Sequence, residues 1–164
     1  MLHLTSDSTV VIIGPPGSGK TRVGEVLAEA SGLPLYSTDR FLGDSHVAAL
    51  YAVMQLTGDT GWIVEGLVGY RMLRKRAQFG MPPPDIVIQL HATDDEIEQS
   101  YMARQQHCDI RRIRAFCAAH DAVLEDYYAL DSESPAIWVY AKSPHVCRLI
   151  GGGPSGTANR DSSK

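Results

Sequence analysis

The chain lacks the features of an exported or membrane-spanning protein. It has no apolar run of roughly 18 residues, the length that a transmembrane helix requires. The N-terminal stretch "MLHLTSDST" has neither the basic start nor the long apolar segment of a signal peptide. There are only three cysteines, and this small odd number argues against a framework of structural disulfides. We therefore expect a cytoplasmic protein.

A zinc ligand set is also missing from the sequence. Cys108, Cys117 and His120, with His107 beside the first of them, are the only group that suggests one. Their spacing matches no common zinc-binding pattern. We expect ordinary thiols and imidazoles at these positions.

Strong charge of either sign is absent as well. The formal net charge is −4, which gives no overall attraction to nucleic acid or anionic lipid. With 44% apolar residues in 164, the composition is that of one globular domain. Residues 151–164, "GGGPSGTANRDSSK", carry no apolar pattern and are predicted to be a disordered tail. The predicted organisation is one domain over residues 1–150 followed by that tail.

What the sequence does contain is a regular alternation of strand and helix patterns. Short apolar, β-branched runs predict strands at 8–14, 33–39, 61–66, 82–92 and 135–141. Helical spacing of apolar residues predicts helices at 19–32, 44–59, 69–80, 93–106 and 111–130. Alternation of this kind predicts an α/β fold, with a five-stranded parallel sheet that carries helices on both faces.

The first strand-to-helix junction holds the most specific motif, "GPPGSGKT". Its spacing fits G-x-x-x-x-G-K-[ST], the P-loop or Walker A motif, in which backbone N–H groups and a helix N-terminus surround phosphate oxygens. In such a loop the lysine reaches the β- and γ-phosphates and the threonine hydroxyl holds Mg²⁺. We therefore predict a P-loop NTPase fold in which nucleotide is bound by Gly14, Pro15, Pro16, Gly17, Ser18, Gly19, Lys20 and Thr21, with Thr21 as the metal ligand.

Two carboxylates follow other predicted strands and should lie near the same edge of the sheet. Asp39 follows "LPLYST" and Glu65 follows "GWIV". A hydroxyl that attacks a γ-phosphate benefits from a carboxylate that accepts its proton. Asp39 is the candidate for that role, and helix capping is its alternative. Glu65 could share the role, position Mg²⁺ through water or bind the acceptor.

Arginines form two clusters. Guanidinium groups bind phosphate oxygens in a forked geometry and stabilise the charge of a transferring phosphoryl group. We predict this role for Arg104 and Arg111, on either side of a break near Cys108 and Asp109 that would form a short lid. Arg71 is a candidate for substrate binding, whereas Arg74 and Arg76 are expected on a solvated helix face.

Together these residues resemble small P-loop kinases of the nucleoside and nucleotide kinase group. The segment "LHATDDEIEQSYMARQQHCDIRRIRAFCAAHDAVLEDYYAL" is similar in layout to thymidylate-kinase-like enzymes, and its Phe116 is expected in the core. The resemblance implies ATP and Mg²⁺ as cosubstrates and a lid arginine near the γ-phosphate. Thymidylate kinases carry an Asp-Arg-aromatic signature after the third strand, where this chain has "EGLVGYR". Shikimate- and gluconate-type kinases also end the second strand with aspartate, as "STDRF" does, although their other acceptor signatures are not evident.

Three functions follow from these patterns. The first is an ATP-dependent kinase that phosphorylates a hydroxyl of a nucleoside- or nucleotide-type acceptor. The second is a thymidylate-kinase-like enzyme that phosphorylates 5-hydroxymethyluracil bases in phage DNA, with the basic stretch "RMLRKR" on the DNA phosphates. The third is a nucleotide-binding switch without an acceptor.

Overall fold

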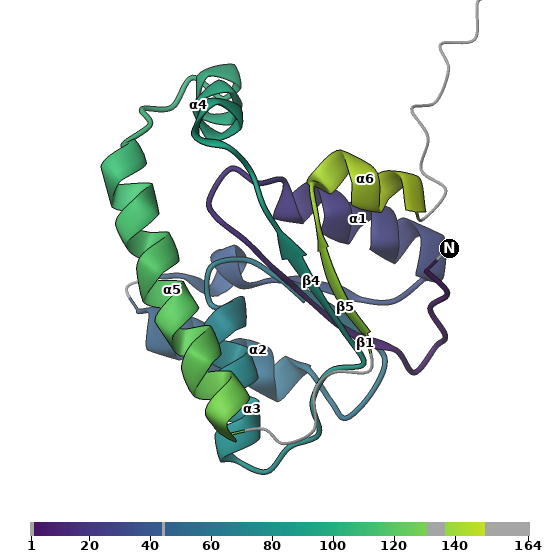
Figure 1. The fold of residues 1–164 in the computed structure, drawn as a ribbon. Helices are drawn as coiled ribbons and strands as arrows, with labels where there is room; N and C mark the ends of the chain where they lie inside the picture. The colour runs from purple at the N-terminus through teal and green to yellow at the C-terminus, as the bar shows by residue number, and fades with distance from the viewer. Residues whose placement is uncertain (1, 44, 131–136, 150–164) are drawn as a thin grey trace, which may run out of the picture.

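The computed structural model describes residues 2–43, 45–130 and 137–149 (Figure 1). The predicted tail over residues 151–164 lies outside this range. No helix within the described residues combines the length and the apolar character needed to cross a bilayer.

The centre of the molecule is a five-stranded sheet in which every pair of neighbours is parallel. The strand order is β2-β3-β1-β4-β5. This confirms the predicted parallel α/β sheet. The strands are β1 (Thr9–Ile13), β2 (Leu35–Ser37), β3 (Trp62–Glu65), β4 (Ile86–Leu90) and β5 (Ile137–Ala141).

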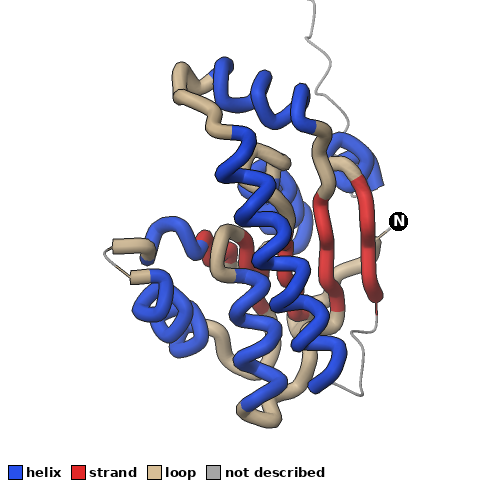
Figure 2. Tube along the Cα trace, turned by 60° about the vertical axis from the view of Figure 1, so that its left-hand side comes forward, coloured by secondary structure: helices blue, strands red, loops and turns tan. Residues whose placement is uncertain are grey.

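Helices cover both faces of the sheet, as the alternation predicted. α1 (Lys20–Ser31) and α6 (Ser143–Leu149) lie on one face. α2 (His46–Leu56), α3 (Gly69–Gln78) and α5 (Ile110–Leu130) lie on the other, where α5 runs the length of the sheet (Figures 1 and 2). The helix α6 was not predicted, because its seven residues are too few to show a helical period.

The apolar run of β1 is explained by the two cores that it separates. Val11 and Ile13 point into the core beneath α2, α3 and α5, whereas Val10 and Ile12 point into the core beneath α1. All four side chains are fully buried. A central parallel strand buries both of its faces, so its sequence shows no polar alternation.

The second strand is shorter than predicted and ends in a turn that shapes the carboxyl edge of the sheet. Thr38–Phe41 forms a 3₁₀ helix, η1, directly after β2. Gly66, just beyond β3, has φ +119°, and a Cβ atom there would lie 2.2 Å from Thr38 Oγ1 and 2.9 Å from Asp39 Oδ1. Only glycine permits this close approach without strain. Gly66 therefore allows the β3–α3 loop to pack directly against η1.

The chain leaves β4 through α4 (Asp94–Ala103) and returns through α5, and the break between them is where the lid was expected. Thr93 and Glu96 form the predicted capping box at the start of α4. Glu96 also accepts a hydrogen bond from Lys142, 2.7 Å away, just before α6. Arg114 of α5 pairs with Asp94 of α4. These contacts connect α4 to both the sheet edge and α5.

The prediction that Arg76 lies on a solvated helix face was wrong. Its side chain is only 1% exposed, its guanidinium lies 5.1 Å from the centre of the Trp62 ring, and its Nη2 donates to the carbonyl of Pro82. Gly69, Met72 and Leu73 are buried on the same helix, so position 76 continues the buried stripe at helical spacing. Arg74, by contrast, is partly exposed and pairs with Asp126 at 3.0 Å.

Candidate active site

The "GPPGSGKT" segment forms a tight turn between β1 and α1. Gly17 and Gly19 adopt φ values of +84° and +88°, which side chains rarely tolerate. A Cβ atom on Gly19 would lie 2.7 Å from the Ser143 hydroxyl oxygen. Gly19 is also the N-cap of α1 and supplies no side-chain acceptor to the first turn. The backbone N–H groups at this end of α1 are thus left to an acceptor that is not part of the helix.

Lys20 lies over this loop. Its ammonium group donates to the carbonyl oxygens of Gly14 and Pro15, at 3.0 and 2.9 Å, and its side chain is 7% exposed. Burial lowers the pKa of Lys20, while the nearby Glu65 and Asp39 carboxylates act in the opposite direction. The loop thus holds a buried cation beside the uncapped start of a helix, which is an arrangement suited to an anion.

Glu65, the last residue of β3, is buried beside Lys20 with 1% exposure. Its Oε2 accepts a hydrogen bond from the Thr21 hydroxyl at 3.4 Å. Its Oε1 makes no hydrogen bond of good geometry among the described residues, although the Ser37 hydroxyl is close enough to affect the group's ionisation. Burial raises the pKa of Glu65, and the Ser37 hydroxyl and the Lys20 charge partly offset this effect. A buried carboxylate next to the P-loop hydroxyl has the chemistry of an outer ligand for a cation.

Asp39 lies in η1 and is exposed toward the same space. Its Oδ1 accepts a hydrogen bond from the backbone N–H of Leu67, 3.1 Å away in the β3–α3 loop. The neighbouring Thr38 hydroxyl oxygen accepts from the N–H of Val68 at 3.3 Å. These two contacts fix the Asp39 carboxylate relative to the end of β3. The alternative expectation was that Asp39 caps the following helix. Its carboxylate instead accepts from Leu67, which lies in a different loop.

These residues line a cleft of about 420 Å³, which we call the P-loop cleft. It is formed by the loop, the ends of β2 and β3, and one side of α4. Its lining residues are Pro16, Gly17, Gly19, Lys20, Thr21, Arg22, Asp39, Glu65, Leu67, Ser100, Tyr101 and Arg104. The cleft thus brings together the predicted P-loop, both predicted carboxylates and one predicted lid arginine.

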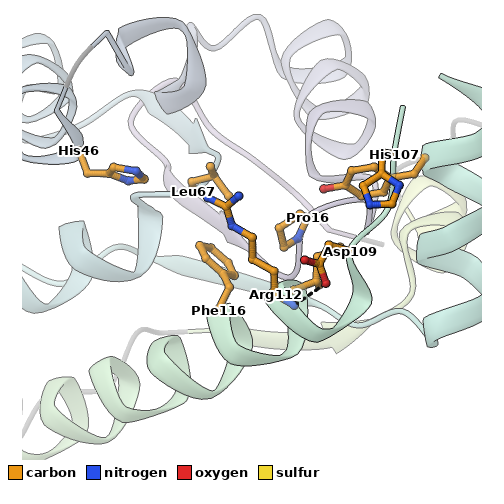
Figure 3. Close-up of a pocket in the computed structure, with 9 residues that line it drawn as sticks. Pro16, His46, Leu67, His107, Asp109, Arg112 and Phe116 are labelled. Carbon is orange, nitrogen blue, oxygen red and sulfur yellow. Dashed lines mark hydrogen bonds between the residues drawn. The ribbon is translucent and has the colours of Figure 1, made fainter. Parts of the chain in front are cut away.

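A second cavity of about 530 Å³ adjoins the P-loop cleft, and we call it the α5 pocket (Figure 3). The two cavities share Pro16, Leu67 and Tyr101. Figure 3 shows the Arg112 side chain extending from the first turn of α5 across this pocket toward Leu67. The full lining consists of Pro16, His46, Leu67, Tyr101, His107, Asp109, Arg112, Ile113 and Phe116.

The predicted arginines divide between these cavities and the outer surface. Arg104 lines the P-loop cleft, where its guanidinium lies 4.7 Å from the centre of the Tyr101 ring and its Nε donates to the Ser100 carbonyl. Arg111 and Arg71 are both exposed and are not among the residues that line either cavity. Arg112, adjacent to Arg111, lines the α5 pocket instead.

Several contributors to the site were not singled out in the sequence, among them Arg112, Leu67 and the lining role of Phe116. The side chain of Phe116 is half-buried and faces the α5 pocket rather than lying wholly in the core as expected. No motif marks Leu67, since its peptide group makes the contact. The turn formed by Gly66 is the only local signal that could have pointed to this loop.

Comparison with known proteins gives matches of structure only. No protein-family model matches the sequence, and a search of curated proteins returns no significant match. Among solved structures, the chain is similar to a gluconokinase from Sinorhizobium meliloti 1021, with a TM-score of 0.60 and 18% identity over 90% of this chain and 91% of that one. A shikimate kinase from Acinetobacter baumannii in complex with shikimate gives 0.57 and 15%, over 89% and 90%. A sugar kinase from Janibacter sp. HTCC2649 gives 0.50 and 16%, over 87% and 91%.

None of these three structures is a thymidylate kinase, so the thymidylate-kinase-like part of the resemblance stays a prediction. At this level of identity the similarity concerns the path of the backbone. It extends over almost the whole described chain and includes the parallel sheet and its helices. The chain therefore has the fold of the P-loop kinases.

Proposed function

We propose that residues 1–150 form an ATP-dependent kinase domain that transfers the γ-phosphate of ATP to a hydroxyl group of a small acceptor. The observation that carries the proposal is that two cavities adjoin at the loop residue that orients the Asp39 carboxylate. The P-loop cleft and the α5 pocket share Leu67, whose N–H holds Asp39. One cavity suits the nucleotide phosphates and the other suits an acceptor. A nucleotide switch would need only the first.

The residues of the P-loop cleft fit a nucleotide with Mg²⁺. Gly17 and Gly19 give the loop its positive-φ turn, and the first turn of α1 has no side-chain cap. Lys20 would bind the β- and γ-phosphates, and Thr21 would hold Mg²⁺ with Glu65 behind it through water. When bound, Mg²⁺ neutralises negative charge on the phosphates. Within the described residues no group of three or more His, Cys, Asp or Glu side chains forms a separate metal site.

The remaining groups have roles that the geometry suggests. Asp39 would accept the proton of the acceptor hydroxyl as its oxygen bonds to the γ-phosphorus and the bond to the bridging oxygen of ADP breaks. Lys20 and Arg104 would stabilise the charge on the transferring group. Arg111 lines neither cavity, so we give it no direct role in this proposal.

The α5 pocket favours an acceptor with an anionic group and an apolar ring. Arg112, His46 and His107 supply positive or ionisable donors, whereas Phe116 and Tyr101 supply aromatic walls. A nucleotide-type acceptor has both features, whereas a nucleoside has the ring alone. The names of the structural neighbours favour hydroxy acids instead, because one acts on gluconate and another binds shikimate. Arg71 is not among the residues that line the pocket, so we give it no direct role in this proposal.

The DNA alternative depends on the basic stretch of α3. Fewer of its basic side chains are available at the surface than the sequence suggested. Arg76 is buried against Trp62, Arg74 pairs with Asp126, and the Lys75 ammonium lies 5.7 Å from the centre of the Phe79 ring. Of the four cations of that stretch, Arg71 is the exposed one. We therefore favour a free small molecule over 5-hydroxymethyluracil in DNA.

The test is phosphate transfer from γ-labelled ATP with Mg²⁺ to parallel acceptors: nucleosides, nucleoside monophosphates, gluconate, shikimate, ordinary DNA and DNA with 5-hydroxymethyluracil. Label on one small molecule supports the proposal and identifies the acceptor class. Label on the modified DNA alone would establish the DNA alternative. ATP binding without transfer, and without acceptor-stimulated ADP release, would favour the switch.

A further inference from the structure

His120 is a buried polar side chain that the proposed mechanism does not use. It lies in the middle of α5 and is 6% exposed. Both ring nitrogens face backbone carbonyl oxygens: Nδ1 is 2.8 Å from that of Phe116, and Nε2 is 3.2 Å from that of Leu67. The second of these contacts joins α5 to the β3–α3 loop, 53 residues away in sequence.

The imidazole is fixed on its faces as well. The Phe116 ring lies 3.7 Å away at a tilt of 31°, and the Tyr70 ring of α3 meets it edge-on at 4.3 Å. Phe116 lines the α5 pocket, and Leu67 lines both cavities. His120 therefore contacts the walls of the candidate site from behind without lining either cavity.

The backbone of Leu67 connects this histidine to the candidate base. Its carbonyl oxygen meets His120, and its N–H donates to Asp39 Oδ1 at 3.1 Å. The two contacts are on opposite sides of one loop residue, and Gly66 keeps that loop against η1. A displacement of the Leu67 carbonyl would therefore also displace the N–H group that orients Asp39.

We propose that His120 is a positioning residue that couples α5 to Asp39 through the backbone of Leu67. The role of Asp39 rests on the proposed kinase function, whereas the hydrogen-bonded connection itself does not. Since Arg112 lies two turns earlier on the same helix, the arrangement links the wall that would hold the acceptor to the group that would deprotonate it.

The protonation state of His120 limits how it can serve both carbonyls. Burial lowers its pKa, as do the charges of Arg71 on α3 and Lys20 on α1, while the two carbonyl contacts act in the opposite direction. A neutral imidazole has one N–H group and can donate to one carbonyl only, whereas the imidazolium ion donates to both. The Leu67 contact should therefore strengthen as the pH falls through the pKa of His120.

Amide hydrogen exchange of Leu67 in the intact chain tests the connection directly, because the Asp39 contact protects that proton. In His120→Phe, which keeps an aromatic ring but loses the donor, we expect exchange at Leu67 to be about 10-fold faster relative to the β1 amides, which report global opening. In His120→Gln the amide nitrogen can replace Nε2, and exchange should return toward the wild-type value. Should His120→Phe not fold, His120→Asn keeps only the Phe116 contact and should show the same acceleration.

Leu124→Ala is the matched control, because Leu124 is a buried residue of the same helix without a contact to Leu67. It should accelerate the β1 and Leu67 amides alike. Unchanged relative exchange at Leu67 in His120→Phe would overturn the inference, whatever the activity. In phosphate transfer, His120→Phe should lower kcat roughly three- to tenfold at unchanged KM for ATP, with partial recovery in His120→Gln. A wild-type chain without transfer would instead refute the proposed function and leave the exchange result standing.

Discussion

The P-loop cleft and the α5 pocket are neighbours, but they are built in different ways. Much of the lining of the P-loop cleft comes from one continuous segment, Gly14–Thr21, whose shape is set by its backbone conformation. The α5 pocket takes its lining from the P-loop, α2, the β3–α3 loop, α4, α5 and the turn between the last two. A local segment can be recognised from its spacing, whereas a pocket assembled from distant segments depends on how the helices are rotated.

This difference implies different responses to substitution. A change in the P-loop cleft should affect the transfer of phosphate to every acceptor, because the donor is common to all. A change in the α5 pocket should affect one acceptor and spare the nucleotide. Asp39 lies between these cases, since its carboxylate is in the cleft and its position depends on the loop that both cavities share.

Lys20→Ala should have the largest effect. Removing the cation should lower phosphate transfer by about 10³-fold or more for all acceptors, because charge on the transferring group loses its main partner. Labelled-phosphate transfer measures the loss, and a circular dichroism spectrum checks that the fold is kept. Full activity in this variant would contradict the assignment of the P-loop.

Asp39→Asn should reduce kcat by about 100-fold or more, because the amide cannot take the acceptor proton. The amide oxygen can still accept the Leu67 N–H, so the loop should keep its place. ATP affinity, measured by calorimetry, should remain close to that of the wild type. An unchanged kcat would remove Asp39 from the catalytic step and weaken the distinction between the two cavities.

Arg112→Ala and Arg111→Ala form a matched pair on one turn of α5. Loss of Arg112 should raise KM for an anionic acceptor by about 10- to 100-fold, the range expected for a charged hydrogen bond. KM for ATP should not change. Arg111 lines neither cavity, so Arg111→Ala should leave both constants within about twofold of wild type. Equal effects of the two substitutions would mean that long-range charge, not contact, governs acceptor binding.

Glu96→Gln should have the smallest effect. Glu96 does not line the cleft, but its hydrogen bonds hold α4, which does. The hydrogen bond from Lys142, together with those from Thr93, lowers the pKa of Glu96 to about 2 from 4.5. A carboxylate with a lowered pKa stabilises the fold above its ordinary pKa, and this stabilisation is lost as the pH falls from about 4.5 toward 2. Thermal unfolding between pH 5 and pH 3 should therefore show a weaker pH dependence in Glu96→Gln. Lys142→Met should weaken it in the same way, and no change in either variant would show that the contact is not maintained in solution.

The strands, five of the helices and the P-loop were predictable because each is encoded by a continuous segment. Residues 10–13 are apolar without interruption, as a central strand must be, and the capping box at Thr93 marks the start of α4. The closeness of Asp39 and Glu65 was also predictable, because parallel strands bring their carboxyl ends to one edge of the sheet.

The side-chain directions on α3 and α5 were not predictable in the same way. Consecutive helical residues point about 100° apart, so a choice between Arg111 and Arg112 requires the rotation of α5 about its axis. Arg76 follows Lys75 in a basic run, which predicts a solvated helix face, yet the face of the Trp62 ring accommodates its guanidinium. His120 contacts a backbone carbonyl oxygen. Any residue at position 67 has that oxygen, so the sequence does not reveal the contact.

Lys20 has one further consequence for how a nucleotide would be bound. Because its ammonium group already donates two of its three N–H groups to loop carbonyls, phosphate oxygens would mostly replace existing hydrogen bonds. The number of hydrogen bonds then contributes little to the binding free energy, and the gain comes from exchanging neutral carbonyl dipoles for an anion. Affinity should accordingly increase with the negative charge of the ligand and decrease with ionic strength. The loop would thus discriminate between ligands by their charge more than by their shape.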